Sequence, residues 1–436
     1  MEIFAALTGF AVLFTFALLG VPLVAAMGLG GVAGLFVAGI PLSGAPIAVL
    51  GVLGNFAWIA LPLFIILGGL LSDIGVSRGM IWFGEAIGRR VRGGTSQVVI
   101  VTSLFMGGMT GSTLAEAGML SAMFRKEMER IGYGRGYLAG LISCAGLIGA
   151  LIPPSNVLLI LGLAGEISIL RLWIAGILPG VLIAIGLMIV AAFLHSRYEG
   201  GAQASSMNDA LSRVQEATRG SFIKALPGLA VPVLILGGMR MGVFSPVEAG
   251  AAGIVFALII GALLYSDNFT LRRLSTSFGN NLMRSMSYLF LVAGAAVFGV
   301  LIVRLNMATA VEQWFIAGQF SAVEFMIANF VLFFIMGFFI EAVPIMLIFF
   351  PLMLPAARSL GIDPIHFGIT FSLIILLANL TPPVGVQTLF VCRLMDTSVG
   401  EWWKHGKYFF LVIVIVTMLV MFIPAIPLSL PALIMR

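Results

Sequence analysis

The chain has 436 residues with a net charge of +5, and 61% of them are hydrophobic while only 9% are charged, against roughly 25% in a typical soluble domain. This composition excludes an ordinary soluble enzyme, and it excludes a nucleic-acid-binding protein because the basic residues fall in short clusters between apolar runs. We therefore expect an all-α, polytopic membrane protein whose apolar N-terminus is a span and not a cleaved signal peptide.

Apolar runs long enough to cross a bilayer recur along the whole chain. We expect spans at 3–19, 21–40, 50–71, 137–163, 172–194, 222–239, 246–264, 283–303, 364–391 and 408–423. The long hydrophilic stretch 196–221 predicts a cytoplasmic linker between two halves, 1–195 and 222–436. Amphipathic stretches predict helices along the membrane interface at 77–92, 308–320 and 397–407, with Trp314, Trp402 and Trp403 as interfacial anchors.

Two interrupted apolar segments, 95–124 and 323–357, each fit either one tilted span or a hairpin that enters and leaves on one face. Basic clusters flank the first segment on both sides, so a single crossing would place one cluster outside, against the positive-inside rule. With two re-entrant hairpins, the basic residues fall on the cytoplasmic side except Arg171, Arg240, Arg304, Arg358 and Arg436. We therefore predict two inverted repeats.

The two halves also match in sequence at one constant offset, which carries the Pro153-Pro154 pair onto Pro382-Pro383. Each pair interrupts an apolar run and removes two backbone donors, so nearby carbonyls are expected to lack partners at Gly149, Ile152, Ala378 and Thr381. In a membrane such carbonyls need protein, water or a cation. A lone proline often only kinks a span, but a repeated pair favours a midplane ion site, with breaks at 149–156 and 378–385.

Polar residues also occur inside the two hairpin segments. The first tip contains Thr110 and Ser112, whose hydroxyl oxygens are suited to bind a cation. Each hairpin also contains an acid, Glu116 in the first and Glu341 in the second. An acid at membrane depth costs at least ~2.5 to 3.5 kcal/mol, which favours a functional role, although each acid also fits a helix N-terminal cap. Neither hairpin contains a His or Lys base for a hydrolase, and no Gly-rich loop precedes a lysine, so we expect neither an enzyme nor an ATP-driven pump.

Several motifs together resemble the large membrane subunit of tripartite ATP-independent periplasmic (TRAP) transporters over essentially the whole chain. They are Gly-Met-Thr-Gly-Ser at 108–112, Gly-Tyr at 132–133, Ile-Pro-Pro-Ser at 152–155, Ala-Gly-Ile-Leu-Pro-Gly at 175–180, Pro-Val-Glu-Ala at 246–249, His-Phe-Gly at 366–368 and Thr-Pro-Pro-Val-Gly at 381–385. The resemblance implies an elevator-type, sodium-coupled importer of an organic acid such as a C4-dicarboxylate or sialic acid, in the bacterial inner membrane. It also implies a periplasmic substrate-binding protein and a small four-span membrane subunit as partners. A single-component sodium/dicarboxylate symporter, with no binding protein, is the alternative.

The resemblance also assigns residues to the site, with two or more sodium ions and no organic cofactor. The sodium ligands implied are Thr110, Ser112, Gly149, Ile152, Pro154, Glu341, Ala378 and Thr381. The substrate-binding residues implied are Glu116, Ser112, Ser155, Asn156, Glu341, Asn379 and Gly385. The chain departs from the family pattern in two respects, since Thr-Gly-Ser replaces Ser-Gly-Ser at the first tip and glutamates replace the shorter aspartates at 116 and 341.

Overall fold

The computed structural model is helical throughout the residues that it describes, which are 1–88, 91, 93–198, 221–265, 269–382 and 385–435. Six described helices are long and apolar enough to cross a membrane, namely those at Phe56–Ile74, Ile169–Leu194, Pro246–Leu264, Leu271–Arg304, Ala342–Ser359 and Val399–Phe422. Shorter apolar helices lie between them. The expectation of an all-helical polytopic membrane protein is confirmed.

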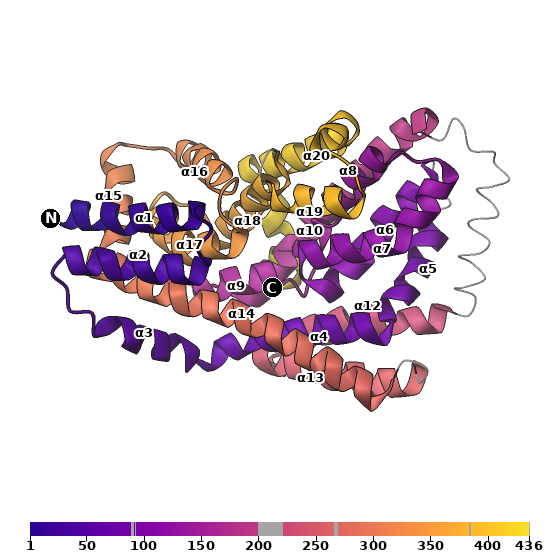
Figure 1. Ribbon diagram of the computed structural model, residues 1–436, viewed down its shortest axis with the longest axis horizontal. Coiled ribbons are helices and arrows are strands. Elements are labelled where there is room, and N and C mark those ends of the chain that lie inside the picture. The colour runs from indigo at the N-terminus through magenta and orange to yellow at the C-terminus, as the bar shows by residue number, and fades with distance from the viewer. Residues whose placement is uncertain (89–90, 92, 199–220, 266–268, 383–384, 436) are drawn as a thin grey trace.

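Both halves repeat one order of elements, shown in Figure 1. The first half contains α1 (Glu2–Leu18), α2 (Leu23–Val37), α3 (Gly44–Leu53), η1 (Phe56–Ile59), α4 (Ala60–Ile74), α5 (Val76–Gly88), α6 (Gly94–Thr110), α7 (Thr113–Ile131), α8 (Arg135–Ala145), η2 (Ile148–Ala150), α9 (Asn156–Ala164) and α10 (Ile169–Tyr198). The second contains α12 (Ser221–Arg240), α13 (Pro246–Leu264), α14 (Leu271–Arg304), α15 (Met307–Ala317), α16 (Ala322–Met336), α17 (Ala342–Ser359), α18 (Pro364–Leu380), α19 (Val386–Leu394), α20 (Val399–Phe422) and α21 (Ala425–Ile434). Each half thus has a helical hairpin, then a helix broken at its prolines, then a long helix.

The two halves interlock through their broken helices. The part after the first break, α9, packs against α17 of the second hairpin, and the part after the second break, α19, packs against α7 of the first hairpin. The long helices are exchanged in the same way, because α20 packs against α8 and α10 packs against α18. Each half therefore completes the packing of the other.

Helices α2, α3, α4, α13 and α14 form what we call the frame. The long α14 contacts α2, α3 and α4, and α13 contacts α4, so the frame mixes elements of both halves. Figure 1 shows the frame along the lower part of the molecule, with the broken helices and α16 to α20 above it. The site lies where these two parts meet.

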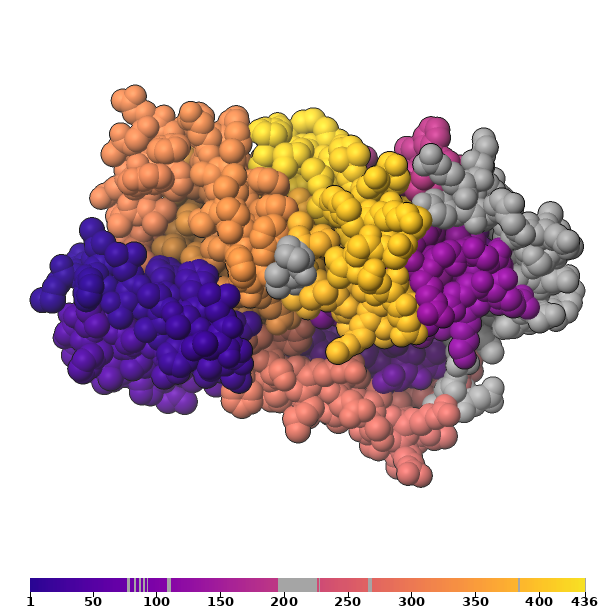
Figure 2. Space-filling model, turned by 45° about the horizontal axis from the view of Figure 1, so that its top comes forward, coloured from indigo at the N-terminus to yellow at the C-terminus, as the bar shows by residue number. Residues whose placement is uncertain are grey.

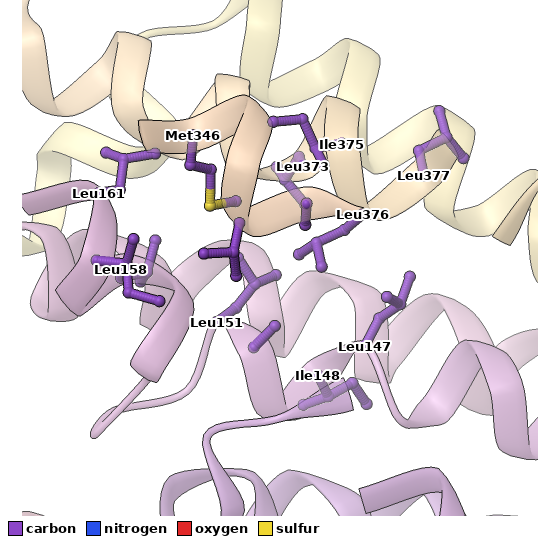
Figure 3. Close-up of a cluster of buried hydrophobic side chains, with 14 of the residues drawn as sticks. Leu147, Ile148, Leu151, Leu158, Leu161, Met346, Leu373, Ile375, Leu376 and Leu377 are labelled. Atoms are coloured by element: carbon purple, nitrogen blue, oxygen red, sulfur yellow. The ribbon is translucent and has the colours of Figure 1, made fainter. Parts of the chain in front are cut away.

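Aliphatic side chains fill the space between the two broken helices. Figure 3 shows side chains of the first half facing side chains of the second, and each of those labelled is at most 1% exposed. They are Leu147, Ile148, Leu151, Leu158 and Leu161 of the first half, and Met346, Leu373, Ile375, Leu376 and Leu377 of the second. Glycines allow the helices to approach closely around this core. A Cβ at Gly140 of α8 would lie 2.4 Å from the Gly406 Cα of α20. Burial of this kind contributes roughly 25 cal/mol per Å² of apolar surface.

The structure corrects four sequence-based expectations. The predicted span 50–71 is divided, since α3 ends at Leu53 and a short 3-10 helix precedes α4, while α14 begins at Leu271, well before the predicted 283. The stretch 397–407 is no separate interfacial helix, because α20 runs unbroken from Val399. Trp402 is not an interfacial anchor: it is fully buried, and its Nε1 donates to the Ser143 Oγ at 2.7 Å. A polar indole N–H finds a buried partner here, which amphipathic spacing alone does not reveal.

Other expectations agree with the structure. Helix α5 covers 77–88 of the predicted amphipathic stretch 77–92, of which residues 89, 90 and 92 lie outside the described residues, and α15 covers 308–317 of the stretch 308–320. Each of the two interrupted segments consists of two helices joined by a short turn, and separate helices precede and follow each proline pair. Residues 383 and 384 of the predicted break 378–385 lie outside the described residues. Most of the predicted linker 196–221 lies outside the described residues. The inverted orientation of the repeats stays a prediction.

Cysteine labelling tests that orientation. Single cysteines at Val91 and Gly134, which flank the first hairpin and are exposed, should both react with a membrane-impermeant thiol reagent from the cytoplasmic side. Single cysteines at Ser321 and Ser359, which flank the second hairpin, should both react from the opposite side. The native Cys144 and Cys392 are buried, so the parent protein provides a low background. Labelling of either pair from two different sides would show a crossing span and contradict the inverted repeat.

Candidate functional site

A cavity of about 740 Å³ lies between the frame and the tips of both hairpins. We call it the inner cavity. The frame contributes residues from Ile65 to Asp73 of α4 and from Asn280 to Leu291 of α14. The opposite wall comes from the two hairpin tips and from the helices on either side of the two breaks. In Figure 2, dark purple residues of the first half lie recessed between the yellow C-terminal segment and the salmon segment of the second half.

Four helix N-termini converge on the inner cavity. Its lining includes the first residues of α7, α17, α9 and α19, at Thr113, Ala342, Asn156 and Val386. Helix N-termini carry unpaired N–H groups and the positive end of the helix dipole, so they attract negative charge. The convergence makes the cavity suitable for an organic anion.

The hairpin tips are built by local sequence. Gly111 ends α6 with a φ of 55°, a left-handed conformation that glycine adopts without strain, and it turns the chain into Ser112, the N-cap of α7. Glu341 is the N-cap of α17 at the corresponding place, since the offset that carries Pro153 onto Pro382 also carries Ser112 onto Glu341. Both residues line the inner cavity, so a hydroxyl and a carboxylate occupy equivalent positions in it.

The prolines leave backbone carbonyls unpaired at the first break. A continuous helix would offer the Gly149 and Ala150 carbonyls the N–H groups of Pro153 and Pro154, which prolines lack. The Ser155 hydroxyl donates to the Ala150 carbonyl in their place. No group in the described part of the chain donates to the Gly149 or Ile152 carbonyl. These oxygens are suited to a hard cation such as sodium.

At the second break, more of the backbone carbonyls accept a hydrogen bond than at the first. Thr381 Oγ1 donates to the Leu377 carbonyl at 2.8 Å, and the Thr381 N–H donates to the Ala378 carbonyl at 3.0 Å. Thr388 Oγ1 donates to the Leu380 carbonyl at 2.6 Å. The predicted ligand Ala378 therefore already has a backbone partner, unlike Gly149 in the first break.

Glu116 lies behind the cavity wall and not among the residues that line it. Its side chain is fully buried in the first turn of α7, where it accepts a hydrogen bond from the Ser103 hydroxyl of α6. The Ala145 carbonyl of α8 lies 2.7 Å from the same Ser103 oxygen and shares its single hydrogen. A Cβ at Gly149 would lie 1.6 Å from the Glu116 Oε2, so the carboxylate rests directly on the break. Glu116 thereby links the first hairpin to the first broken helix.

The predicted site residues divide into two groups. Four line the inner cavity: Ser112, Asn156, Glu341 and Asn379. The others lie behind it, either buried or half-buried, at Glu116, Gly149, Ile152, Pro154, Ser155, Ala378, Thr381 and Gly385. The side chain of Thr110 lies outside the described part of the structure.

Sequence reasoning missed the polar residues that the frame contributes. The lining includes Asp73 of α4 and, on α14, Asn280, Asn281, Arg284, Ser287 and Tyr288. A predicted span starting at 283 placed Arg284 at the membrane edge. The helical spacing of Asn280, Arg284 and Ser287 is the signal that predicts one polar face on a longer helix.

A second cavity of about 500 Å³, the outer cavity, follows the first along α14. The α14 residues from Val292 to Gly299 line it, next to those of the inner cavity, and so do η1, the end of α9 and the loop before α10. The two cavities thus touch successive stretches of the same helices.

An ion pair ties the first hairpin to the second half outside the cavities. Arg125 of α7 donates to Asp396, which follows α19, at 2.6 Å from its Nη2, and it also donates to the Leu394 carbonyl. The hydrogen bond from Arg125 holds the pKa of the Asp396 carboxyl below its ordinary value. The pair therefore remains charged at neutral pH, and it is lost only as the pH falls through that lowered pKa.

Comparisons with known proteins agree with this arrangement. The family described as the tripartite ATP-independent periplasmic transporter, DctM component, matches residues 10–426. The sialic acid TRAP transporter large permease protein SiaM of Vibrio cholerae is 30% identical, over 80% of this chain and 79% of its own length. The C4-dicarboxylate TRAP transporter large permease protein DctM of Pseudomonas aeruginosa is 29% identical, over 86% of both. The solved YdaH transporter of Alcanivorax borkumensis has a TM-score of 0.56 at 18% identity, covering 89% of each chain, which shows a shared fold.

Proposed function

Since the chain belongs to the DctM component family of the tripartite ATP-independent periplasmic transporters, we propose that it is a sodium-coupled importer of an organic acid. Relatives named for sialic acid and C4-dicarboxylates make a carboxylate the substrate class. Family membership also supports two partners in the bacterial inner membrane and periplasm, a small four-span membrane subunit and a soluble binding protein that delivers the substrate.

The convergence of four helix N-termini on the inner cavity carries this proposal. Each terminus presents N–H donors and a partial positive charge of roughly half a unit, so a carboxylate in the cavity is stabilised without a dedicated cation from each helix. The site belongs equally to both halves, because α7 and α9 come from the first and α17 and α19 from the second. An acid group is therefore the ligand that this geometry fits best.

Sodium coupling rests on the carbonyls at the first break and on Glu341. The unpaired Gly149 and Ile152 carbonyls lie beside the first hairpin, whereas Glu341 supplies a carboxylate at the second tip. Bound sodium would be coordinated by these oxygens and would complete the cavity wall on which the anion binds. The positive charge of the cation then favours the negative charge of the substrate, so each assists binding of the other.

Alternating access is proposed to follow the two cavities along α14. The hairpins and broken helices would move as one body against the frame, so that the site between their tips faces first the outer and then the inner cavity.

Uptake by the complete transporter in proteoliposomes tests the sodium coupling. With binding protein present and labelled N-acetylneuraminate or succinate outside, an inward sodium gradient should raise the initial rate at least tenfold over a potassium gradient, and ATP should have no effect. Equal uptake in sodium-free buffer would contradict the proposal. Full uptake without binding protein would favour the single-component alternative.

A further inference from the structure

Arg284 is a cation in the inner cavity. It has no role in the proposed sodium site or in the proposed binding of the anion by helix N-termini. Among the described residues that line this cavity, the charged ones are Asp73, Arg284 and Glu341, so Arg284 is the positively charged side chain there. It is exposed to the cavity, and no carboxylate in the described part of the chain lies within 4.0 Å of its guanidinium. A guanidinium held at this depth without an ion partner is suited to an incoming anion.

The neighbours of Arg284 provide further donors. Asn280 lies one turn before it on α14, and Ser287 and Tyr288 lie one turn after it, and all three line the same cavity. Tyr288 lies within electrostatic range of both the Arg284 guanidinium and the Glu341 carboxylate. One face of α14 therefore presents a guanidinium, an amide and two hydroxyls to the hairpin tips, and all of these groups can donate hydrogen bonds.

The described residues that line the outer cavity include no such cation. Asn55 and Arg284 are equivalent positions in the two halves, because they are separated by the same number of residues as Pro153 and Pro382. Asn55 lines the outer cavity, whereas Arg284 lines the inner cavity. Within the described lining of the outer cavity, the charged residue is the acid Glu166. The two cavities thus differ in charge, since the outer cavity has the amide of Asn55 and the acid Glu166, and the inner cavity has the guanidinium of Arg284.

The charge pattern of the chain assigns the inner cavity to the cytoplasmic side. Four of its α14 residues, Asn280, Asn281, Arg284 and Ser287, lie in the first half of the helix, which begins at Leu271 and continues with Arg272 and Arg273. The excess of basic residues at this end, against Arg304 at the other end of the helix, indicates the cytoplasmic face. On the frame, Arg284 is therefore available to a substrate that has reached the inner side.

We propose that Arg284, with Asn280 and Tyr288, forms an anion subsite on the frame that binds the acid group of the substrate only when the site faces the cytoplasm. This inference rests on the proposed function, because it requires an anionic substrate. A guanidinium pairs with a carboxylate through two parallel hydrogen bonds, which a lysine does not reproduce. Arg284 is then a substrate-binding residue of the inward-facing state, and it should affect the internal affinity and not the external one.

Internal inhibition of uptake separates the two affinities. Proteoliposomes with the complete transporter are preloaded with unlabelled succinate or N-acetylneuraminate, and the initial rate of labelled uptake is measured under a sodium gradient. For Arg284→Gln we expect the half-inhibitory internal concentration to rise at least tenfold, while the external KM changes less than twofold. Arg284→Lys should lie between the two, and Arg272→Gln, on the same helix but outside the cavity, should behave as the parent.

Two results would overturn the inference. If the half-inhibitory internal concentration and the external KM rise together, Arg284 binds substrate in both orientations of the site. If neither changes, Arg284 does not bind the substrate. Thermal unfolding of the purified variants with and without each acid controls for folding, and Arg284→Gln should unfold at the parent temperature without ligand but gain less stabilisation from it. A parent protein that neither transports nor is stabilised by either acid would remove the proposed function and this subsite together, whereas normal transport with unaltered internal inhibition would remove the subsite alone.

Discussion

Gly149→Ala should abolish measurable uptake and lower the midpoint of thermal unfolding. The new Cβ would lie 1.6 Å from the Glu116 Oε2 and 3.2 Å from the Gly107 Cα, so the carboxylate and the first hairpin cannot both stay in place. Overpacking of a filled core costs about 1–3 kcal/mol, and displacement of Glu116 also removes its hydrogen bond with Ser103. Uptake in proteoliposomes and thermal unfolding of the purified protein measure the two effects.

The matched control is Gly279→Ala. Gly279 lies in α14, and a Cβ there would meet nothing within 4 Å, so this variant should transport and unfold as the parent does. The double variant Gly149→Ala with Glu116→Ala removes the carboxylate that the new methyl group meets. It should recover part of the lost stability, because the two effects act on the same space. Parental uptake by Gly149→Ala would show that Glu116 can leave the break without consequence, and would contradict the link between hairpin and broken helix.

Glu341→Gln should weaken the apparent affinity for sodium by about tenfold to a hundredfold. The change keeps the shape of the N-cap of α17 but removes the charge, and an interaction with a charged group contributes ~1.5–3 kcal/mol. Half-saturation of uptake by sodium, at several substrate concentrations, measures the effect. An increase confined to the substrate KM would instead assign Glu341 to the substrate.

Glu312→Gln provides the control for that variant. Glu312 lies in α15 and does not line the inner cavity, so its neutralisation should leave the sodium dependence unchanged. A second comparison uses Ser112→Ala at the equivalent N-cap of α7, where only a hydroxyl is lost and a change of less than tenfold is expected. Equal sodium affinity in Glu341→Gln and the parent would exclude this carboxylate from the sodium site.

The breaks and the hairpin turns could be predicted from sequence because their causes are local. Proline lacks an N–H wherever it stands, and the glycine at 111 permits the turn between α6 and α7 without help from distant residues. The division of the site residues between the cavity and the packing behind it was not predictable in this way. Glu116 and Ser112 are separated by one helical turn, yet only tertiary packing places one against Gly149 and the other in the cavity.

The frame residues were missed for a related reason. A hydropathy pattern identifies the apolar part of α14, whereas Arg284 and Asn280 lie in its polar first half. Which face of that half meets the hairpin tips depends on how α14 crosses α4, and no local signal encodes that crossing. The sequence thus predicts the elements better than it predicts their facing surfaces.

The interlocking of α9 with α17 and of α19 with α7 makes the two halves depend on each other as subunits do. A single half, made alone, would expose the surfaces of its hairpin and broken helix that the other half covers. Two copies of such a half would cover those surfaces mutually, as the subunits of a homodimer do. The present chain thus has, within one polypeptide, the mutual packing that two subunits of a dimer have. Because the two halves belong to one chain, equivalent positions can carry different residues, as Ser112 and Glu341 do, and as Asn55 and Arg284 do.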